Sequence, residues 1–514
     1  MSRPSAFAEA GLGGSVAAVV EEMQALYLAD AIPWVVGYSG GKDSTAVLQL
    51  VWAAITGLSP DQRNKPVHVI STDTLVENPV VARWVATSLE TMQASATEQG
   101  LPIEPHRLTP DVASTFWVNL IGRGYPAPRP KFRWCTERLK IKPSNAFIRR
   151  VVRENGEAIL VLGTRKAESS VRRYRMEQLE GERVRDRLSP NESLPNSLVY
   201  SPIEDWSNDD VWLYLMQVAN PWGYDNKDLM AMYRGASEDN ECPLVVDSST
   251  PSCGDSRFGC WTCTLVDKDK SMSAMIQNDE EKEWMLPLLE LRNALDLTDD
   301  RPLRDFRRMN GKVQLFHDRP IPGPYTEVAR HDWLRRLLEA QTWIRANGPD
   351  YVQGIELITP EELHEIRRLW VFEKHEIEDA LPGIFKEATG KDFPGPSLDD
   401  ALVLRADDLG VLRDLCEDDL HYQLTRELLD VERQFRTMTR RSGLFDALEG
   451  AFRRSYFEDA EDATDHARRR RMDNPDEVDA EEAEASHEPV QLVDPDEAPG
   501  PAPSESVVHV KFGR

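Results

Sequence analysis

A glycine-rich loop containing lysine, aspartate and two serines is the first feature of this sequence that indicates chemistry. The loop, Ser39-Gly-Gly-Lys-Asp-Ser44, lies between an apolar run at 33–37 and a helix-like apolar stretch at 45–52. Glycine lets a backbone approach phosphate closely, and the free amides and dipole of a helix N-terminus favour negative charge. The loop is shorter than the one that precedes Gly-Lys-Ser/Thr in the Walker A motif. We therefore predict a different kind of phosphate-binding loop.

Each position of this loop is a predicted contact of the nucleotide: Ser39, Gly40, Gly41, Lys42, Asp43 and Ser44. Ser39, Asp43 and Ser44 are also candidates for catalysis. Lys42 either meets phosphate or is a solvated loop lysine.

A second candidate phosphate-binding element follows an apolar run at 158–163. It reads Gly163-Thr-Arg-Lys-Ala-Glu-Ser-Ser-Val-Arg172. Arg165 and Arg172 offer planar guanidinium groups that match phosphate oxygens, and Arg165 is also a catalytic candidate. Glu168 either orients one of these arginines or helps to hold Mg²⁺.

The cysteines give a second strong signal. Four of them, Cys242, Cys253, Cys260 and Cys263, lie within one short segment with turn-forming Gly and Pro residues. Thiolates gathered this closely bind tetrahedral zinc or an iron–sulfur cluster. Only one pair has the two-residue spacing of a zinc knuckle, so the uneven spacing favours a 4Fe–4S cluster.

Cys135 stands apart, in a segment that carries Arg133, Arg138 and Lys140. Positive surroundings favour the thiolate form, which suits a sulfur carrier. Cys135 is equally suited to replace one of the other four cysteines as a cluster ligand. The sixth cysteine, Cys416, lies in a helical pattern and is expected to be structural.

Alternating elements position these residues. Apolar strand-like runs are expected at 33–37, 67–71, 101–105, 158–163 and, less clearly, 198–203, with helices at 44–55, 79–98, 112–121 and 143–153 between them. This order predicts an α/β fold, a parallel sheet with helices on both faces. Ligands bind beyond the carboxyl ends of such strands, where the two phosphate-binding elements and the segment 72–74 fall.

The chain divides into five expected parts: an N-terminal helical segment (1–30), a nucleotide-binding domain (31–222), a Cys-rich loop region (223–280), a mainly helical C-terminal region (281–457) and an acidic disordered tail (458–514). The tail is too polar to offset its ordering entropy. A Thr359-Pro-Glu-Glu362 segment predicts a capped helix start.

Composition narrows the classes of partner. The chain has 61 basic and 88 acidic residues among 514, a net charge of −27, which argues against general capture of nucleic acid or an anionic membrane. The segment 123–187 reverses this balance, with 18 basic and 8 acidic residues, and predicts a focused polyanion site. No apolar run is long enough to span a membrane, no signal pattern opens the chain, and six cysteines form no disulfide framework. We expect a cytoplasmic protein.

The loop resembles the SGGxDS loop of PP-loop ATP pyrophosphatases, through Ser39, Gly40, Gly41, Asp43 and Ser44. The element 163–172 resembles the GxRxxESxxR element of PAPS reductase-like proteins, and Pro202-Ile-Glu-Asp-Trp206 resembles their PIxxW segment. The resemblance implies an adenine nucleotide α-hydrolase-like fold that cleaves ATP between the α and β phosphates. It also implies that Asp73 contacts ribose or adenine, although a strand-end aspartate can simply cap a helix.

Further segments make the resemblance more specific. The run Trp117-Val-Asn-Leu-Ile-Gly-Arg-Gly-Tyr-Pro126, the run Arg133-Trp-Cys-Thr136 and Cys260-Trp-Thr-Cys263 are similar to DndC-type proteins of bacterial DNA phosphorothioation systems. The match covers about residues 30–340. Those proteins are understood as iron–sulfur ATP pyrophosphatases that work with a cysteine desulfurase and other modification proteins on DNA.

The resemblance implies ATP, Mg²⁺ and a 4Fe–4S cluster as cofactors, and adenylylation of a DNA phosphate before sulfur displaces AMP. Two alternatives remain. A PAPS reductase would need a reducing thiol near the C-terminus, but no cysteine follows Cys416. A non-catalytic nucleotide-sensing subunit would bind ATP without turning it over.

Overall fold

The computed structural model describes residues 5–130, 132–191, 193–236, 258–316, 318–395, 406–436, 438 and 441–473. Its N-terminal half contains a six-stranded sheet with the order β3-β2-β1-β4-β6-β5. The strands are β1 (Trp34–Gly37), β2 (Val67–Thr72), β3 (Ile103–Leu108), β4 (Ala158–Val161), β5 (Ser189–Pro190) and β6 (Ser197–Tyr200). All neighbours run parallel except β5, which pairs antiparallel with β6. The predicted α/β fold is therefore confirmed.

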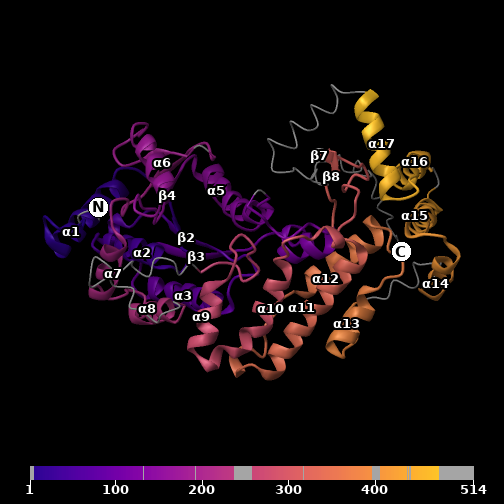
Figure 1. The fold of residues 1–514 in the computed structure, drawn as a ribbon. Coiled ribbons are helices and arrows are strands. Elements are labelled where there is room, and N and C mark those ends of the chain that lie inside the picture. The colour runs from indigo at the N-terminus through magenta and orange to yellow at the C-terminus, as the bar shows by residue number, and fades with distance from the viewer. Residues whose placement is uncertain are drawn as a thin grey trace, which may run out of the picture.

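Alternate residues of each strand face two different cores, as the pleat of a sheet requires. Trp34 and Val36 of β1 pack into a large core with helices α1, α2, α3, α7 and α8, whereas Val35 packs on the other face with helix α5. These helices span Gly11–Leu28 (α1), Lys42–Thr56 (α2), Pro79–Glu98 (α3), Lys142–Asn155 (α5), Asn208–Gln217 (α7) and Asn226–Gly235 (α8). Helix α6 (Ser170–Glu180) follows β4, with no buried side chain of its own. Figure 1 shows the sheet between these two groups of helices.

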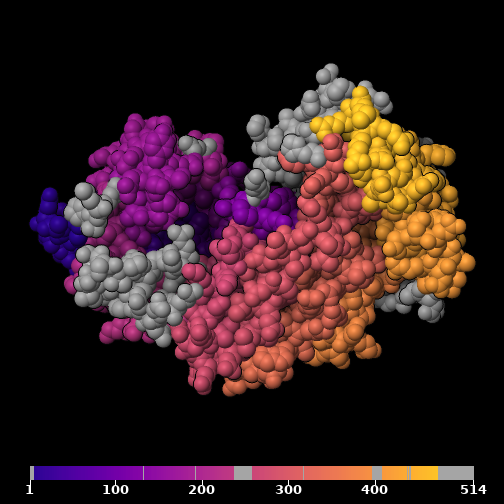
Figure 2. Space-filling view, viewed as in Figure 1, coloured from indigo at the N-terminus to yellow at the C-terminus, as the bar shows by residue number. Residues whose placement is uncertain are grey.

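Helices continue the chain beyond the sheet, and Figure 2 shows them beside the sheet domain. They are α9 (Lys270–Asn278), α10 (Leu286–Leu295), α11 (Glu327–Asn347), α12 (Pro360–Arg368) and α13 (Leu381–Thr389), with a small hairpin of β7 (Leu315–Phe316) and β8 (Arg319–Pro320). The predicted helix start at Thr359 is confirmed: its side chain accepts the Glu362 N–H in a complete capping box. A buried core of Trp, Leu and Ile side chains joins α10, α11 and α12.

The segment around residues 116–139 belongs to this second core, although its sequence lies between strands β3 and β4. Trp117 donates its indole N–H to the Leu357 carbonyl, and Trp370 donates to the Ile121 carbonyl at 3.0 Å. The helix expected at 112–121 is present but interrupted: a 3₁₀ turn (Val112–Ser114) precedes a π-helical segment (Val118–Arg123). A short helix α4 (Trp134–Thr136) and a π-helical turn (Glu137–Ile141) lead into α5.

The last described helices lie at the end of the molecule away from the sheet (Figure 1): α14 (Ala406–Leu415), α15 (Asp419–Arg436), α16 (Leu444–Ser455) and α17 (Ala460–Asp473). The prediction of a disordered tail from residue 458 is therefore wrong for the segment of α17, and residues 474–514 lie outside the described residues. Helix α17 is held by packing of Ala463 with Val313, Leu315 and Phe457, a contact that the polar composition of this segment conceals. Within the described ranges, no helix has the length and apolarity needed to cross a membrane.

Candidate nucleotide and cysteine site

A pocket of about 1130 Å³ opens at the carboxyl ends of the parallel strands. The loop after β1, the segment after β2 and the segment after β4 all line it, as the sheet topology predicts. Helix α2 begins at Lys42 with Gly41 as its N-cap, so the cap residue has no side chain to accept the first amides, although the Tyr233 hydroxyl accepts the Lys42 N–H. The amides of this first helical turn and the helix dipole favour an anion at this end of the pocket.

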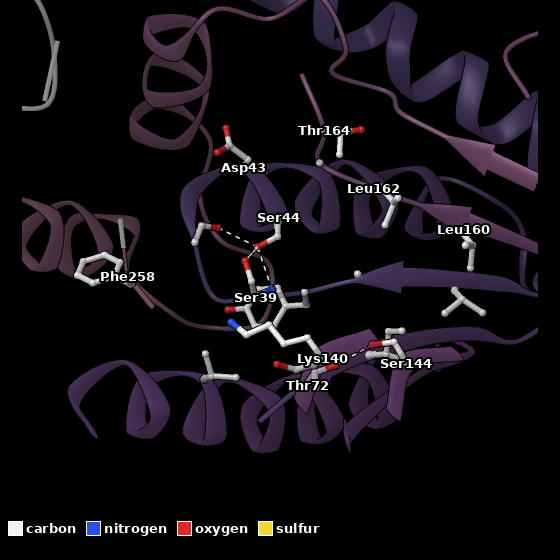
Figure 3. A pocket seen from close by; sticks show the side chains of 18 of the residues that line it. Ser39, Asp43, Ser44, Thr72, Lys140, Ser144, Leu160, Leu162, Thr164 and Phe258 are labelled. Carbon is white, nitrogen blue, oxygen red and sulfur yellow. Dashed lines mark hydrogen bonds between the residues drawn. The ribbon is translucent and has the colours of Figure 1, made fainter. Parts of the chain in front are cut away.

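Internal hydrogen bonds fix the loop after β1 (Figure 3). The Ser44 hydroxyl donates to the Gly41 carbonyl at 3.0 Å, and the Ser39 N–H donates to the Ser44 hydroxyl at 3.2 Å. Gly40 has φ +74°, and a Cβ at this position would lie 2.4 Å from Cγ2 of Val85. The loop therefore requires glycine at position 40 for both its backbone conformation and its contact with α3.

The two predicted phosphate-binding elements meet at Asp43 and Arg165. The Arg165 Nε lies 2.7 Å from the Asp43 carboxylate, and its Nη1 donates to the Trp206 carbonyl. Gly163 permits this approach, because a Cβ there would lie 3.0 Å from the Asp43 backbone carbonyl. Trp206 is buried in the core, in agreement with a packing role.

Glu168 makes its contacts within the second phosphate-binding element, residues 163–172. It forms an ion pair with Arg172, and it accepts the backbone N–H of Arg165 at 2.9 Å. Of the two predicted roles for Glu168, these contacts favour the orientation of arginine over the binding of Mg²⁺. Both Arg165 and Arg172 line the pocket.

Asp73 lines the same pocket and accepts hydrogen bonds from two neighbours. One is the Leu75 N–H at 2.8 Å, and the other is the Arg107 Nε at 2.9 Å. Leu75 has φ +64°, so Asp73 stabilises a tight turn. It does not cap α3, whose N-cap is Asn78.

The described part of the cysteine-rich segment attaches directly to the loop after β2. Trp261 donates its backbone N–H to the Val76 carbonyl at 2.9 Å, and Glu77 and Cys260 form a β-bridge. Cys260 donates its Sγ–H to the Glu77 carboxylate at 3.8 Å and contacts the Thr74 hydroxyl at 3.4 Å. The predicted ligands Cys242 and Cys253 lie outside the described residues.

Cys135 lies with the Cys260–Cys263 pair, close enough for its charge to interact with both. The sequence-based expectation that basic neighbours lower the pKa of Cys135 is wrong. Burial is the largest effect and raises the pKa of this thiol, and the charge of Cys263 adds to it. Arg133 is exposed, and Arg138 lies over the Tyr125 ring at 5.5 Å.

Two side chains belong both to the pocket and to the cysteine site. Lys140 and Glu77 line the pocket and form an ion pair of 3.2 Å. Although desolvation acts in the opposite direction, the charges of Cys260, Glu77 and Cys135 raise the pKa of Lys140. Figure 3 shows the Lys140 side chain beside Ser39 and Thr72.

The donor set at the cysteine site fits a soft metal centre. In the part of the chain that the structure describes, the sulfurs of Cys135, Cys260 and Cys263 do not all lie within 4.8 Å of one another. A tetrahedral zinc ion with Zn–S bonds of about 2.3 Å would bring them to about 3.8 Å. Both a zinc ion and an iron–sulfur cluster take thiolate ligands of this kind.

Sequence reasoning missed several pocket residues. Tyr233 of α8 accepts the Lys42 N–H through its hydroxyl at 3.3 Å, and its ring packs edge-on against Phe258 at 4.8 Å. Both come from segments beyond the strands, so no strand-end pattern could reveal them. Glu77 was detectable, because it follows the carboxyl end of β2 in the same way as Asp73.

Residues 33–265 match the family described as the phosphoadenosine phosphosulfate reductase domain. The chain therefore carries a PAPS reductase-like, nucleotide-binding domain of the PP-loop superfamily. Members of this class are enzymes that act on nucleotides.

Individual relatives are distant. The uncharacterized protein MJ0066 of Methanocaldococcus jannaschii is 27% identical over 192 residues. The matched segment is 37% of this chain and 32%, about a third, of the length of MJ0066. A phosphoadenylyl-sulfate reductase from Candida auris is 14% identical, with TM-score 0.25 over 42% of this chain and 88% of its own. An FMN adenylyltransferase from Candida glabrata is 11% identical, with TM-score 0.26 over 49% of this chain and 72% of its own. Similarity this weak does not extend to the site or the substrate.

Proposed function

We propose that this protein is an ATP pyrophosphatase and sulfurtransferase that activates a DNA backbone phosphate for sulfur incorporation. One observation carries the proposal: Lys140 and Glu77 belong at once to the nucleotide pocket and to the site of Cys135, Cys260 and Cys263. A nucleotide activated in the pocket would lie next to the sulfur chemistry. The similarity of the sequence to DNA phosphorothioation proteins supplies the substrate class.

In the proposed reaction, a non-bridging DNA phosphate oxygen attacks the α-phosphorus of ATP and pyrophosphate leaves. A sulfur nucleophile at the oxidation level of hydrosulfide then attacks the DNA phosphorus. AMP leaves with the original oxygen, and the sulfur loses its proton. The amides at the start of α2, together with Arg165 and Arg172, stabilise the charge that develops on the phosphates. Carboxylates of Asp43 and Asp73 line the pocket and are suitable oxygen ligands for Mg²⁺.

Cys135, Cys260 and Cys263 would hold three corners of a 4Fe–4S cluster, with Cys242 or Cys253 as the fourth ligand. When bound, the cluster would supply electron-transfer chemistry. The position of Cys135 beside the pair favours this ligand role over that of a separate sulfur carrier. A cysteine desulfurase would supply sulfur, and other phosphorothioation proteins would present the DNA, all in the cytoplasm.

Nucleotide turnover tests the proposal. Anaerobically purified protein is incubated with ATP or PAPS, with and without DNA and partner proteins. We expect equal amounts of AMP and pyrophosphate from ATP and no sulfite from PAPS. Sulfite release would identify a PAPS reductase. Tight ATP binding without AMP formation under every condition would identify a nucleotide sensor.

A further inference from the structure

A second group of metal-ligating side chains lies on the sheet, apart from the pocket and the cysteines. His68 is on β2, and Glu104 and His106 are on the edge strand β3. His68 is paired in register with Glu104, and Ile70 with His106. Side chains two residues apart share a face of a strand, so Glu104 and His106 project from the same face of the sheet. His68 projects from that face too, because it is the register partner of Glu104. None of the three lines the nucleotide pocket.

The three donor atoms converge. His68 Nδ1 lies 3.1 Å from His106 Nε2 and 3.2 Å from Glu104 Oε2, and His106 Nε2 lies 3.8 Å from Glu104 Oε2. Ligands about 2.0 Å from a tetrahedral metal ion lie about 3.3 Å from one another. The observed triangle therefore has the size of one face of a metal coordination sphere. Two imidazoles and one carboxylate are a common ligand set for divalent transition metals.

The surroundings make this a defined, half-open site. The Phe147 ring of α5 packs against His68 at 5.6 Å and against His106 at 4.8 Å, which limits the movement of both imidazoles. The Arg150 guanidinium lies over the Phe147 ring at 4.7 Å, and its charge and that of Glu104 act in opposite directions on both imidazoles. Glu104 is 53% exposed, so an ion and its remaining ligand water can enter from that side.

We propose that His68, Glu104 and His106 bind a divalent transition metal ion of the zinc class that ties edge strand β3 to β2. Strand β3 also carries Arg107, the partner of Asp73 in the nucleotide pocket. The ion would thus secure a strand whose far end shapes that pocket. Its role is structural and does not depend on the proposed DNA chemistry.

The competing explanation is a metal-free hydrogen bond between the two imidazoles, since a nitrogen–nitrogen distance of 3.1 Å suits either state. Zinc binding to the full-length protein, measured with a competing indicator dye, distinguishes the metal site from the metal-free hydrogen bond. The variants are His106→Gln and Glu104→Gln, and His421→Gln is the matched control because His421 is an exposed histidine on α15. The cysteine site is identical in all four proteins, so it contributes equally to each.

We expect the wild type and His421→Gln to bind one more zinc ion than His106→Gln, and Glu104→Gln to bind that ion at least about tenfold more weakly. Cobalt(II) gives a second readout, because the ion lost in His106→Gln should lack thiolate charge-transfer absorption. Zinc should raise the thermal unfolding midpoint of the wild type more than that of His106→Gln.

Circular dichroism establishes that each variant is folded. Glu104→Gln, at an exposed position, keeps the test open if His106→Gln does not fold. Equal zinc stoichiometry and affinity in the wild type and Glu104→Gln would overturn the proposal.

Discussion

Lys140 and Glu77 form an ion pair, with Nζ 3.2 Å from Oε1, at the point where the nucleotide pocket meets the cysteine site. Glu77 also accepts the Cys260 Sγ–H, and Lys140 lies close enough to the same sulfur to interact with it when the thiol is ionised. The pair therefore connects two kinds of chemistry that lie far apart in the sequence. In the proposed function, the pair would couple the nucleotide chemistry to the sulfur chemistry.

Removing the positive charge of this pair should impair nucleotide cleavage. In Lys140→Gln, the Glu77 carboxylate would face the pocket uncompensated and repel the triphosphate. We expect ATP-dependent AMP release to fall by about tenfold, the scale of one oriented charge contact. Lys142→Gln is the control, since Lys142 is exposed and does not line the pocket. Equal rates in the two variants would remove Lys140 from the account.

The loop side chains make a second prediction. Asp43→Ala frees Arg165, and Ser44→Ala removes the hydroxyl that joins Gly41 to Ser39. Each change should lower pyrophosphate release by more than about tenfold. Ser59→Ala removes an exposed hydroxyl outside the pocket and should leave the rate unchanged. Full activity in Asp43→Ala and Ser44→Ala would be incompatible with cleavage at this loop.

Backbone geometry predicts opposite effects for two glycines. Gly40→Ala places a methyl group 2.4 Å from Val85 at φ +74°, and should destabilise the protein by about 1–3 kcal/mol and abolish nucleotide binding. Gly13→Ala adds a methyl group in open space on helix α1 and should stabilise by about 0.5–1 kcal/mol. Denaturant unfolding and nucleotide titration measure both effects. Unaltered binding by Gly40→Ala would show that the loop tolerates a side chain there.

Iron content tests the cysteine site. Anaerobically purified protein should contain iron and sulfide, and Cys135→Ser should lose them together with Cys260→Ser and Cys263→Ser. Cys416→Ser should retain both, because Cys416 follows α14 in the C-terminal helices. If Cys135→Ser keeps its iron but no longer supports sulfur transfer, Cys135 is instead a sulfur carrier. Stoichiometric zinc without iron in the wild type would point to a structural zinc site.

The sheet and the loop were predictable because their signals are local. An apolar run followed by Ser39–Ser44 and a helix defines the site within a few residues, and the alternation of strands and helices gives the topology. The neighbourhood of Cys135 was less accessible, since the basic residues beside it in sequence suggested a low pKa. In the structure burial has the larger effect, and it depends on how residues 116–139 pack against α11 and α12.

Long-range contacts account for the other differences. Tyr233 reaches the phosphate loop from α8, and α17 is stabilised by packing against the β7–β8 region. The cross-strand group of His68, Glu104 and His106 depends on the register of β2 and β3. Neither sequence spacing nor composition encodes such contacts between distant segments.

The phosphorothioate content of cellular DNA tests the central claim most directly. DNA from cells that carry the whole modification system, with and without this chain, is digested and its sulfur-containing dinucleotides are measured by mass spectrometry. We predict that they disappear without the chain and return with the wild type or Ser59→Ala, but not with Asp43→Ala or Cys260→Ser. Undiminished phosphorothioate in cells that lack the chain would contradict the account.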